Sequence, residues 1–214
     1  YQAAPEYGCE SQSREPYEVL YTRWLPYDDV LRLKLVEEMV EVYYNSNQFG
    51  KTLRAIEKLF DNPFALYEAL GAFYDKKGYM DISHTRIRRY EILQEFLQEY
   101  VEEEQMEYYR QLMIYDLYAR ENMKTRPHFA KDPSEWKNES RDFYQKEAET
   151  RTLLPSYTTY DWKQLQRMTH VEVFDYDVLG NGEKARTVLL FDYQKRDPLT
   201  GNAEMIDCSE LFYA

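Results

Sequence analysis

The sequence predicts a mainly α protein of the α+β class: a bundle of about six helices followed by a small C-terminal antiparallel β meander. Apolar residues recur with the 3.6-residue helical period over most of residues 25–150. After Pro155 the pattern changes to short β-branched and aromatic runs separated by turn residues. The 214 residues include only seven glycines and eight prolines, too few for a loop-dominated or all-β protein.

The first two predicted helices follow an irregular lead-in. Pro26-Tyr27-Asp28-Asp29 opens the first helix, because an Asp can cap free N–H groups and suits the positive end of the helix dipole. Asn45-Ser46-Asn47 ends it, and a short second helix is predicted over residues 51–60. The buried stripe of the first helix is expected to contain Leu31, Leu35, Met39 and Val42.

The remaining helices also have recognisable ends. Asn62 is a plausible N-cap with Pro63 at the first helical position, and Gly78 is expected to end this third helix. A longer helical stretch covers residues 83–123, with a break expected at Glu102-Glu103-Glu104. A further helix covers residues 132–150.

The C-terminal region predicts three strands. Residues 170–178 form the first, and the turn that follows contains Asn181-Gly182, a strong hairpin signal. Residues 187–193 form the return strand, and residues 203–208 form a third. So small a meander needs a partner surface, which the helices would supply.

These elements predict three regions: a lead-in at residues 1–24, a helical domain at 25–155, and a region at 156–214 with a helical turn and the meander packed on the helices. The chain begins with Tyr1 rather than Met and shows no signal-peptide pattern, which indicates a fragment of a longer intracellular protein.

Charge and cysteine content disfavour several functional classes. The formal net charge of −12 disfavours nucleic acids and anionic membranes as partners. No apolar run is long enough to span a bilayer. Cys9 and Cys208 lie too far apart for metal-ligand spacing, and two reduced thiols fit a cytoplasmic protein.

No catalytic, cofactor-binding or metal-binding residue can be assigned from motifs. The histidines, His84, His128 and His170, lack the spacing of helical zinc or di-iron sites. No nucleophile elbow or glycine-rich phosphate loop occurs. Whether this chain is itself an enzyme therefore stays open.

Two short segments are candidates for a pocket or an interface. Tyr43, Tyr44, Asn45 and Ser46 are four adjacent hydrogen-bonding side chains that could line a pocket, although the same residues could simply end a helix. His84 and Arg86 lie at a second helix start, where capping and a solvated basic face are the alternative interpretations.

Several motifs resemble one known family. They are Pro16-Tyr17-Glu18-Val19-Leu20, the run from Leu25 to Lys34, Val42-Tyr43-Tyr44-Asn45-Ser46 and Phe49, followed downstream by Phe191-Asp192-Tyr193, Arg196 and Gly201. The chain is similar to the uncharacterised C-terminal domain that follows a cobalamin-binding domain and a radical SAM barrel in bacterial proteins. The similarity covers most of the chain and is best over residues 16–49.

The resemblance implies a parent enzyme that uses a [4Fe–4S] cluster, S-adenosylmethionine and cobalamin. Their Cys-x-x-x-Cys-x-x-Cys and Asp-x-His-x-x-Gly motifs are absent from this sequence, so no ligand can be assigned to this chain. The partners implied are the upstream barrel and cobalamin-binding domains of the same polypeptide, and residues 1–24 would be the tail of the barrel.

Two functional hypotheses follow. The first is a non-catalytic accessory domain that recognises substrate or caps the barrel, which predicts an exposed apolar, tyrosine-lined face. The second is a helical protein-interaction or dimerisation module, with a homodimer as its simplest form. The 22 tyrosines suit either a docking surface or half-buried helix faces. A stand-alone helical metalloenzyme ranks last because of the histidine spacing.

Overall fold

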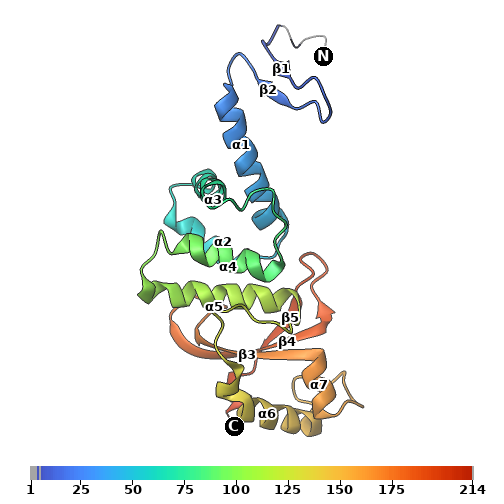
Figure 1. The fold of residues 1–214 in the computed structure, drawn as a ribbon. Helices are drawn as coiled ribbons and strands as arrows, with labels where there is room; N and C mark the ends of the chain where they lie inside the picture. Colours follow the sequence, from blue (N-terminus) through green and yellow to red (C-terminus); the bar gives the residue numbers. More distant parts are fainter. Residues whose placement is uncertain (1–3, 5, 214) are drawn as a thin grey trace. The chain divides into compact units, whose positions relative to one another are not determined.

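The protein is an α+β structure in which eight α-helices and two small antiparallel sheets occupy the described residues (Figure 1). This is a computed structural model, and it describes residue 4 and residues 6–213. In chain order the elements are β1 (Glu10–Ser11), β2 (Val19–Tyr21), α1 (Tyr27–Met39), the π-helical η1 (Val40–Asn45), α2 (Gly50–Ile56), η2 (Glu57–Leu59), α3 (Pro63–Lys77), α4 (Arg86–Leu97), α5 (Glu103–Arg120), η3 (Pro133–Trp136), α6 (Lys137–Thr150), α7 (Trp162–Met168), β3 (Thr169–Tyr176), β4 (Lys184–Arg196), β5 (Ala203–Asp207) and α8 (Ser209–Phe212). The predicted class is confirmed, and the predicted six-helix bundle matches only roughly.

The chain forms two compact units. The first unit contains the residues up to Ser46 and Ile56–Ser83, and the second contains Asn47–Ala55 and the residues from His84 onward. The sequence-based division at residues 24/25 and 155/156 remains a prediction.

The first unit begins with a two-stranded ribbon where an irregular lead-in was expected. Strands β1 and β2 pair antiparallel, with Glu10 opposite Tyr21 and Ser11 opposite Val19. Strands of two and three residues are too short to show an alternating apolar pattern, which explains why the sequence did not reveal them.

Helix α1 differs from its prediction in two details. Pro26 occupies the N-cap position without a side-chain hydrogen bond, so Asp28 and Asp29 lie in the first turn and act on the helix dipole rather than as caps. Leu31, expected on the buried stripe, is 43% exposed, whereas Met39 is fully buried. The reason is that α3 lies beside the C-terminal half of α1 (Figure 1).

Helix α3 has the predicted ends. The side chain of Asn62 accepts a hydrogen bond from the Ala65 N–H at 3.0 Å, and Pro63 is the first helical residue. Gly78 ends the helix with a left-handed backbone, at a φ of 68°. Gly71 lies in the middle of α3, where a Cβ atom would come within 3.0 Å of the Leu35 Cβ and 3.3 Å of the Leu35 backbone. Glycine therefore allows α1 and α3 to approach closely.

The second unit is built around the sheet β3-β4-β5. Val173 lies opposite Val188 in the β3–β4 pair, and Leu190 lies opposite Ile206 in the β4–β5 pair. The three predicted strands and their antiparallel order are confirmed. The break expected at residues 102–104 is confirmed too, since α4 ends at Leu97 and α5 begins at Glu103.

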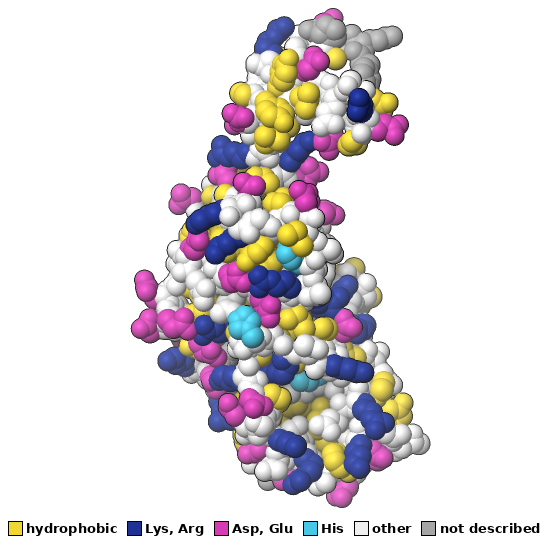
Figure 2. All heavy atoms as spheres, viewed as in Figure 1, with side chains coloured by type: hydrophobic (Ala, Val, Ile, Leu, Met, Phe, Trp, Pro, Cys, Tyr) yellow, Lys and Arg dark blue, Asp and Glu magenta, His cyan; other side chains and the backbone are white. Residues whose placement is uncertain are grey.

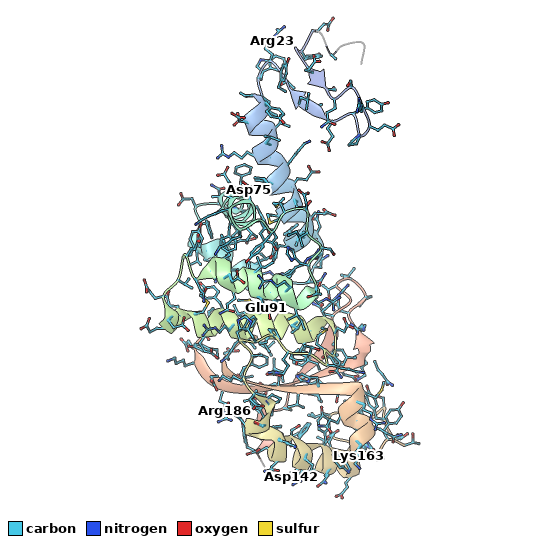
Figure 3. All side chains as sticks on the ribbon, in the orientation of Figure 1. Arg23, Asp75, Glu91, Asp142, Lys163 and Arg186 are labelled. Carbon is cyan, nitrogen blue, oxygen red and sulfur yellow. The ribbon has the colours of Figure 1, made fainter. Side chains whose placement is uncertain are left out.

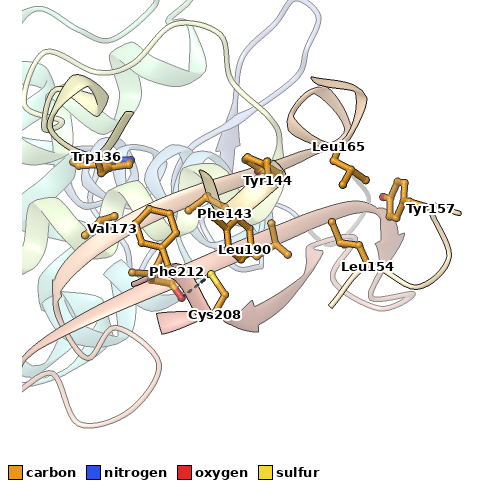
Figure 4. Close-up of a cluster of buried hydrophobic side chains, with 12 residues drawn as sticks. Trp136, Phe143, Tyr144, Leu154, Tyr157, Leu165, Val173, Leu190, Cys208 and Phe212 are labelled. Atoms are coloured by element: carbon orange, nitrogen blue, oxygen red, sulfur yellow. Dashed lines mark hydrogen bonds between the residues drawn. The ribbon is translucent and has the colours of Figure 1, made fainter. Parts of the chain in front are cut away.

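Helices cover both faces of this sheet (Figure 1). One face packs against α6, α7 and α8 in an apolar core (Figure 4). That core contains Trp136, Phe143, Tyr144, Leu154, Tyr157, Leu165, Val171, Val173, Val188, Leu190, Cys208 and Phe212. The opposite face packs against α5, where the ring of Phe191 lies 6.0 Å from that of Tyr115. Side chains that alternate along each strand therefore enter two different buried layers.

Asp116 of α5 holds the start of α2. Its carboxylate accepts hydrogen bonds from the backbone N–H of Lys51 (3.0 Å) and of Thr52 (2.8 Å), and from the Thr52 hydroxyl (2.7 Å). Burial raises the pKa of Asp116 to about 6, although these hydrogen bonds act to lower it. The carboxylate thus satisfies helix N–H groups that would otherwise be unpaired.

Substitution of Gly71 tests the close approach of α1 and α3. We expect Gly71→Ala to lower the free energy of unfolding by about 1–3 kcal/mol, because the added methyl group meets a neighbouring backbone that must move. Gly50→Ala is the matched control, since a Cβ there meets nothing within 4 Å, and its stability should stay equal or rise slightly. Thermal unfolding followed by circular dichroism compares the two variants.

The buried carboxyl of Asp116 should make stability depend on pH. Its pKa in the folded protein lies above that of the unfolded chain, so its contribution to stability should fall as the pH rises from about 4 to about 6, by on the order of 3 kcal/mol. Asp116→Asn should lose this slope, because an amide does not titrate in this range. Urea unfolding at stepped pH measures it, and an unchanged slope in the variant would contradict the assignment.

Candidate functional site

A group of four polar side chains lies between α5 and the sheet, and we call it the Glu172 cluster: Tyr118, Arg126, His170 and Glu172. His170 and Glu172 are two residues apart on β3, so both project from the sheet face that α5 covers. Tyr118 comes from the last turn of α5, and Arg126 comes from the loop that follows. The cluster joins α5, the loop that follows it and β3 within the second unit.

Glu172 is the centre of the hydrogen bonding. Arg126 donates to both carboxylate oxygens, from Nη1 to Oε2 at 2.8 Å and from Nη2 to Oε1 at 2.7 Å. His170 Nε2 lies 2.7 Å from Glu172 Oε2. Arg126 also donates to the Tyr118 hydroxyl at 2.9 Å and to the backbone carbonyl of Lys131 at 3.0 Å. This two-pronged geometry is the strong form of an arginine–carboxylate pair.

Ring stacking fixes the position of His170. Its imidazole lies parallel to the Tyr118 ring, with centroids 3.7 Å apart and planes 12° apart. The Arg126 guanidinium lies 5.4 Å from the centroid of the same tyrosine ring. Since Tyr118 contacts both partners of Glu172, the four side chains form one connected arrangement.

Burial and ion pairing shift the pKa values of Glu172 and Arg126 in opposite directions. Burial raises the pKa of Glu172, but hydrogen bonds from Arg126 and His170 lower it more, so its pKa lies below the usual range. Burial raises the pKa of Tyr118 to about 12. The ion pair with Glu172 outweighs burial and raises the pKa of Arg126. The cluster therefore contains an ionised carboxylate matched by an ionised guanidinium, and a neutral phenol.

A pocket of about 390 Å³ lies next to the cluster. Its lining comes from β3, from η3 with the start of α6, and from α7. The lining residues are Asp132, Pro133, Ser134, Trp136, Lys137, Ser140, Tyr144, Gln166, Thr169, His170 and Val171. His170 belongs to both the cluster and the pocket lining, so the buried ion pair supports one wall of the pocket.

The chemistry of this arrangement suits binding. The volume lies within the range of about 300–1,000 Å³ found for small-ligand sites, and its lining mixes aromatic with polar side chains. Cys208 lies nearby in the apolar core, where burial raises the pKa of its thiol to about 12 and keeps it protonated. Within the part of the chain that the structure describes, no group of three or more His, Cys, Asp or Glu residues could hold a metal ion.

The first predicted segment lies in the first unit. Tyr43 is buried, and its hydroxyl lies 2.7 Å from that of Tyr74, whereas the Tyr44 side chain is 60% exposed. The Asn45 amide donates to the Glu41 carboxylate, and the Ser46 hydroxyl lies 3.4 Å from the Tyr43 carbonyl. These residues occupy η1 and the position after it. Their role as a pocket or interface stays a prediction.

The second predicted segment lies in the second unit. His84 is half-buried and precedes Thr85, whose side chain caps α4 by accepting from the Arg88 N–H. Arg86 pairs with the Glu121 carboxylate. Neither residue lines the pocket beside His170.

No sequence motif indicated the Glu172 cluster. The His-Val-Glu sequence at 170–172 places two polar residues on one face of a predicted strand, which is an unusual pattern for a buried sheet and was the available signal. Arg126, 46 residues from Glu172, stands in a loop with no motif around it. Its pairing could not be deduced without the fold.

Comparisons with known proteins identify a family. Residues 5–191 match the model of the family described as Protein of unknown function (DUF4080), so the chain belongs to this family. No curated protein and no solved structure matches the chain. A search of the helices in the described residues finds none long and apolar enough to cross a membrane.

Breaking the ion pair of the Glu172 cluster should be strongly destabilising. We expect Arg126→Met to lower the free energy of unfolding by about 3–5 kcal/mol, because it leaves the Glu172 carboxylate buried without its cation. The double variant Arg126→Met/Glu172→Leu should recover most of that loss. Arg141→Met, which removes an exposed pair with Asp142, is the control and should change stability by at most about 0.5 kcal/mol. Urea unfolding tests all three, and equal losses in the single and double variants would contradict the pairing.

Proposed function

We propose that this member of the DUF4080 family is a non-catalytic accessory domain, for substrate recognition or for capping the active site, of a cobalamin-binding radical SAM enzyme. The resemblance carried by residues 16–49 supports this parent. The family match supports a domain role, although the family description names no parent enzyme.

An exposed apolar surface at the N-terminal end of the first unit is the observation that carries the proposal. Seven large hydrophobic side chains of the ribbon, its flanking loops and the start of α1 are exposed, and Trp24 is 68% exposed. Figure 2 shows hydrophobic side chains gathered at this end of the first unit. We call these residues the ribbon face: Tyr7, Tyr17, Val19, Tyr21, Trp24, Tyr27 and Leu31. An accessory domain predicts such a tyrosine-rich face.

The ribbon face has the composition of an interface. The Tyr7 and Trp24 rings lie 5.9 Å apart, and the Arg23 guanidinium (labelled in Figure 3) lies 5.8 Å from the Trp24 centroid. Tyr, Trp and Arg are the residues most enriched at interface centres. An isolated two-stranded ribbon is at best marginally stable in water, so a surface that covers β1 and β2 would stabilise them.

The occupant that we propose for the ribbon face is the radical SAM barrel of the same polypeptide. Tyr17 and Val19, two residues of the ribbon face, belong to the Pro16–Leu20 motif that carries the resemblance. Radical chemistry requires a closed site that excludes water, which an accessory domain docked on a barrel can help to provide. The [4Fe–4S] cluster, S-adenosylmethionine and cobalamin would be held by the upstream domains, and the location would be the bacterial cytoplasm.

A second candidate uses the same surface for dimerisation. A homodimer would pair two ribbon faces about a two-fold axis, with aromatic side chains in a self-complementary interface. The two candidates differ in what covers Trp24: another domain of the same polypeptide, or a second copy of the chain.

Hydrogen–deuterium exchange on the full-length gene product tests the proposal. We expect amides of residues 7–33 to exchange more slowly in the anaerobically prepared full-length protein than in the 214-residue chain. The double variant Tyr21→Ser/Trp24→Ser should lose at least about 30-fold of that protection, because it removes two aromatic anchors. Leu199→Ser, at a 92% exposed side chain of the second unit, is the matched control and should change nothing.

Two outcomes would overturn the accessory role. The first is a reading frame without a three-cysteine cluster motif upstream of this chain. The second is equal exchange in the full-length protein and in the 214-residue chain. If sedimentation of the 214-residue chain shows a dimer that the double variant dissociates, the dimerisation module becomes the better account of the ribbon face.

A further inference from the structure

One edge of the sheet in the second unit has backbone groups without partners. The sheet order β3-β4-β5 leaves β3 paired on one side only. In an antiparallel pair, residues alternate between those that bond to the neighbouring strand and those whose N–H and C=O point away from it. The register therefore determines which residues of β3 face the free edge.

The hydrogen bonds of Val188 fix that alternation. Its N–H donates to the Ser209 hydroxyl and its carbonyl accepts from the Cys208 N–H, so both groups face away from β3. Val188 lies opposite Val173, which makes this a pair without mutual hydrogen bonds. By alternation, Thr169, Val171, Val173 and Asp175 turn their backbone groups to the free edge.

The two ends of this edge already have partners. The Thr169 N–H donates to the Leu165 carbonyl, and the Thr169 carbonyl lies 3.4 Å from the Asn122 amide. The Asp175 N–H donates to the Gln111 side chain at 2.8 Å. Both observations agree with the alternation deduced from Val188.

The middle of the edge, at Val171 and Val173, differs from the ends because its outward backbone groups have no partner within the described residues. Within residues 6–213, no hydrogen bond reaches the outward N–H or C=O of Val171 or Val173. Both residues are buried, with exposed fractions of 6% and 5%. Buried backbone groups are almost always paired with protein, water or a ligand, so these positions need partners from outside the described chain.

The pocket of about 390 Å³ opens at Val171. Thr169, His170 and Val171 line it, so it lies along the free edge of β3. At Val173 the space is much smaller, because residues 129–131 enclose a cavity of only about 10 Å³ there. The part of the edge that can accept a ligand is therefore short and centred on Val171.

The opposite walls of the pocket suit a peptide. Trp136 and Tyr144 provide buried aromatic surface. Lys137, Ser140 and Gln166 add polar side chains that make no hydrogen bond within the described residues. An extended peptide presents N–H and C=O groups at the spacing of a strand, together with side chains that alternate between two sides.

We propose that the free edge of β3 at Val171 binds a short extended peptide, supplied by another molecule, as an added strand. The peptide residue opposite Val171 would exchange two main-chain hydrogen bonds with it, and a neighbouring side chain would enter the pocket between Trp136 and Tyr144. This site lies in the second unit and does not rest on the accessory role proposed for the ribbon face.

Nuclear magnetic resonance of the 15N-labelled 214-residue chain tests the site. The probe is a pool of N-acetylated, C-amidated pentapeptides with random side chains at the three central positions. We expect the pentapeptide pool, at millimolar concentration, to shift the amide signal of Val171 and to slow the hydrogen exchange of that amide. A matching pool that is N-methylated at all three central residues should bind at least about tenfold more weakly, because it cannot donate the main-chain hydrogen bond.

Substitutions distinguish main-chain pairing at Val171 from non-specific binding. Val171→Pro removes the outward N–H while leaving the β3–β4 ladder intact, which is the position where an edge strand tolerates proline. It should weaken binding about tenfold, with the His170 and Glu172 signals showing whether the sheet is preserved. Ser140→Phe should fill the pocket and abolish binding even if the proline variant misfolds. Asn138→Phe, on an exposed residue of α6 that does not line the pocket, is its matched control.

Three results would overturn the proposal. They are equal binding of the two peptide pools, signal changes that lie outside the β3 edge and the pocket lining, and no change at millimolar peptide. If Val171 is already protected in the full-length protein and does not respond to the pool there, the edge is filled by the same polypeptide, which also contradicts a ligand supplied by another molecule.

Discussion

The second unit depends on one constraint: a three-stranded sheet is buried on both faces. The central part of strand β4, residues 187–192, is buried on both sides, so its side chains must suit one or the other of two buried layers. The α6–α8 layer is mostly apolar, but it also contains the buried carboxylate of Asp192, which accepts a hydrogen bond from the Tyr157 hydroxyl. The α5 layer contains the buried carboxylate of Glu172, which requires a partner because an unpaired buried charge is costly.

The Glu172 cluster follows from that constraint. A buried ion pair contributes little net stability compared with apolar residues of the same size, because desolvation of both charges offsets their attraction. Its effect is on geometry rather than on net stability. The Glu172 carboxylate has its hydrogen-bond partners only when Arg126, in the loop after α5, and His170, on the same strand, occupy fixed positions. The loop that carries Arg126 continues into η3 at the pocket, so the ion pair also sets the position of one pocket wall.

Local signals in the sequence were sufficient for much of the fold. Asn62, Pro63 and Gly78 mark the ends of α3 by chemistry confined to those residues, and the Asn181-Gly182 turn predicted the β3–β4 hairpin in the same way. The failures involve information that is not local. Leu31 fits a helical stripe, but α3 lies beside the other end of α1. Arg126 and Glu172 meet only because the fold brings together residues that are far apart in sequence. The candidate residues at 43–46 came from an unusual local composition, which says nothing about the neighbours that decide between a pocket and a helix end.

The ribbon face and the β3 edge suit different kinds of partner, because one offers side chains and the other offers main-chain hydrogen-bonding groups. The ribbon face offers large aromatic side chains with few fixed polar contacts, so it favours a broad partner surface whose shape matches it. The β3 edge offers main-chain hydrogen bonds beside a pocket, so it favours an extended backbone. Only the pocket would distinguish one ligand side chain from another. Because the two surfaces belong to different compact units, neither interaction needs the residues of the other.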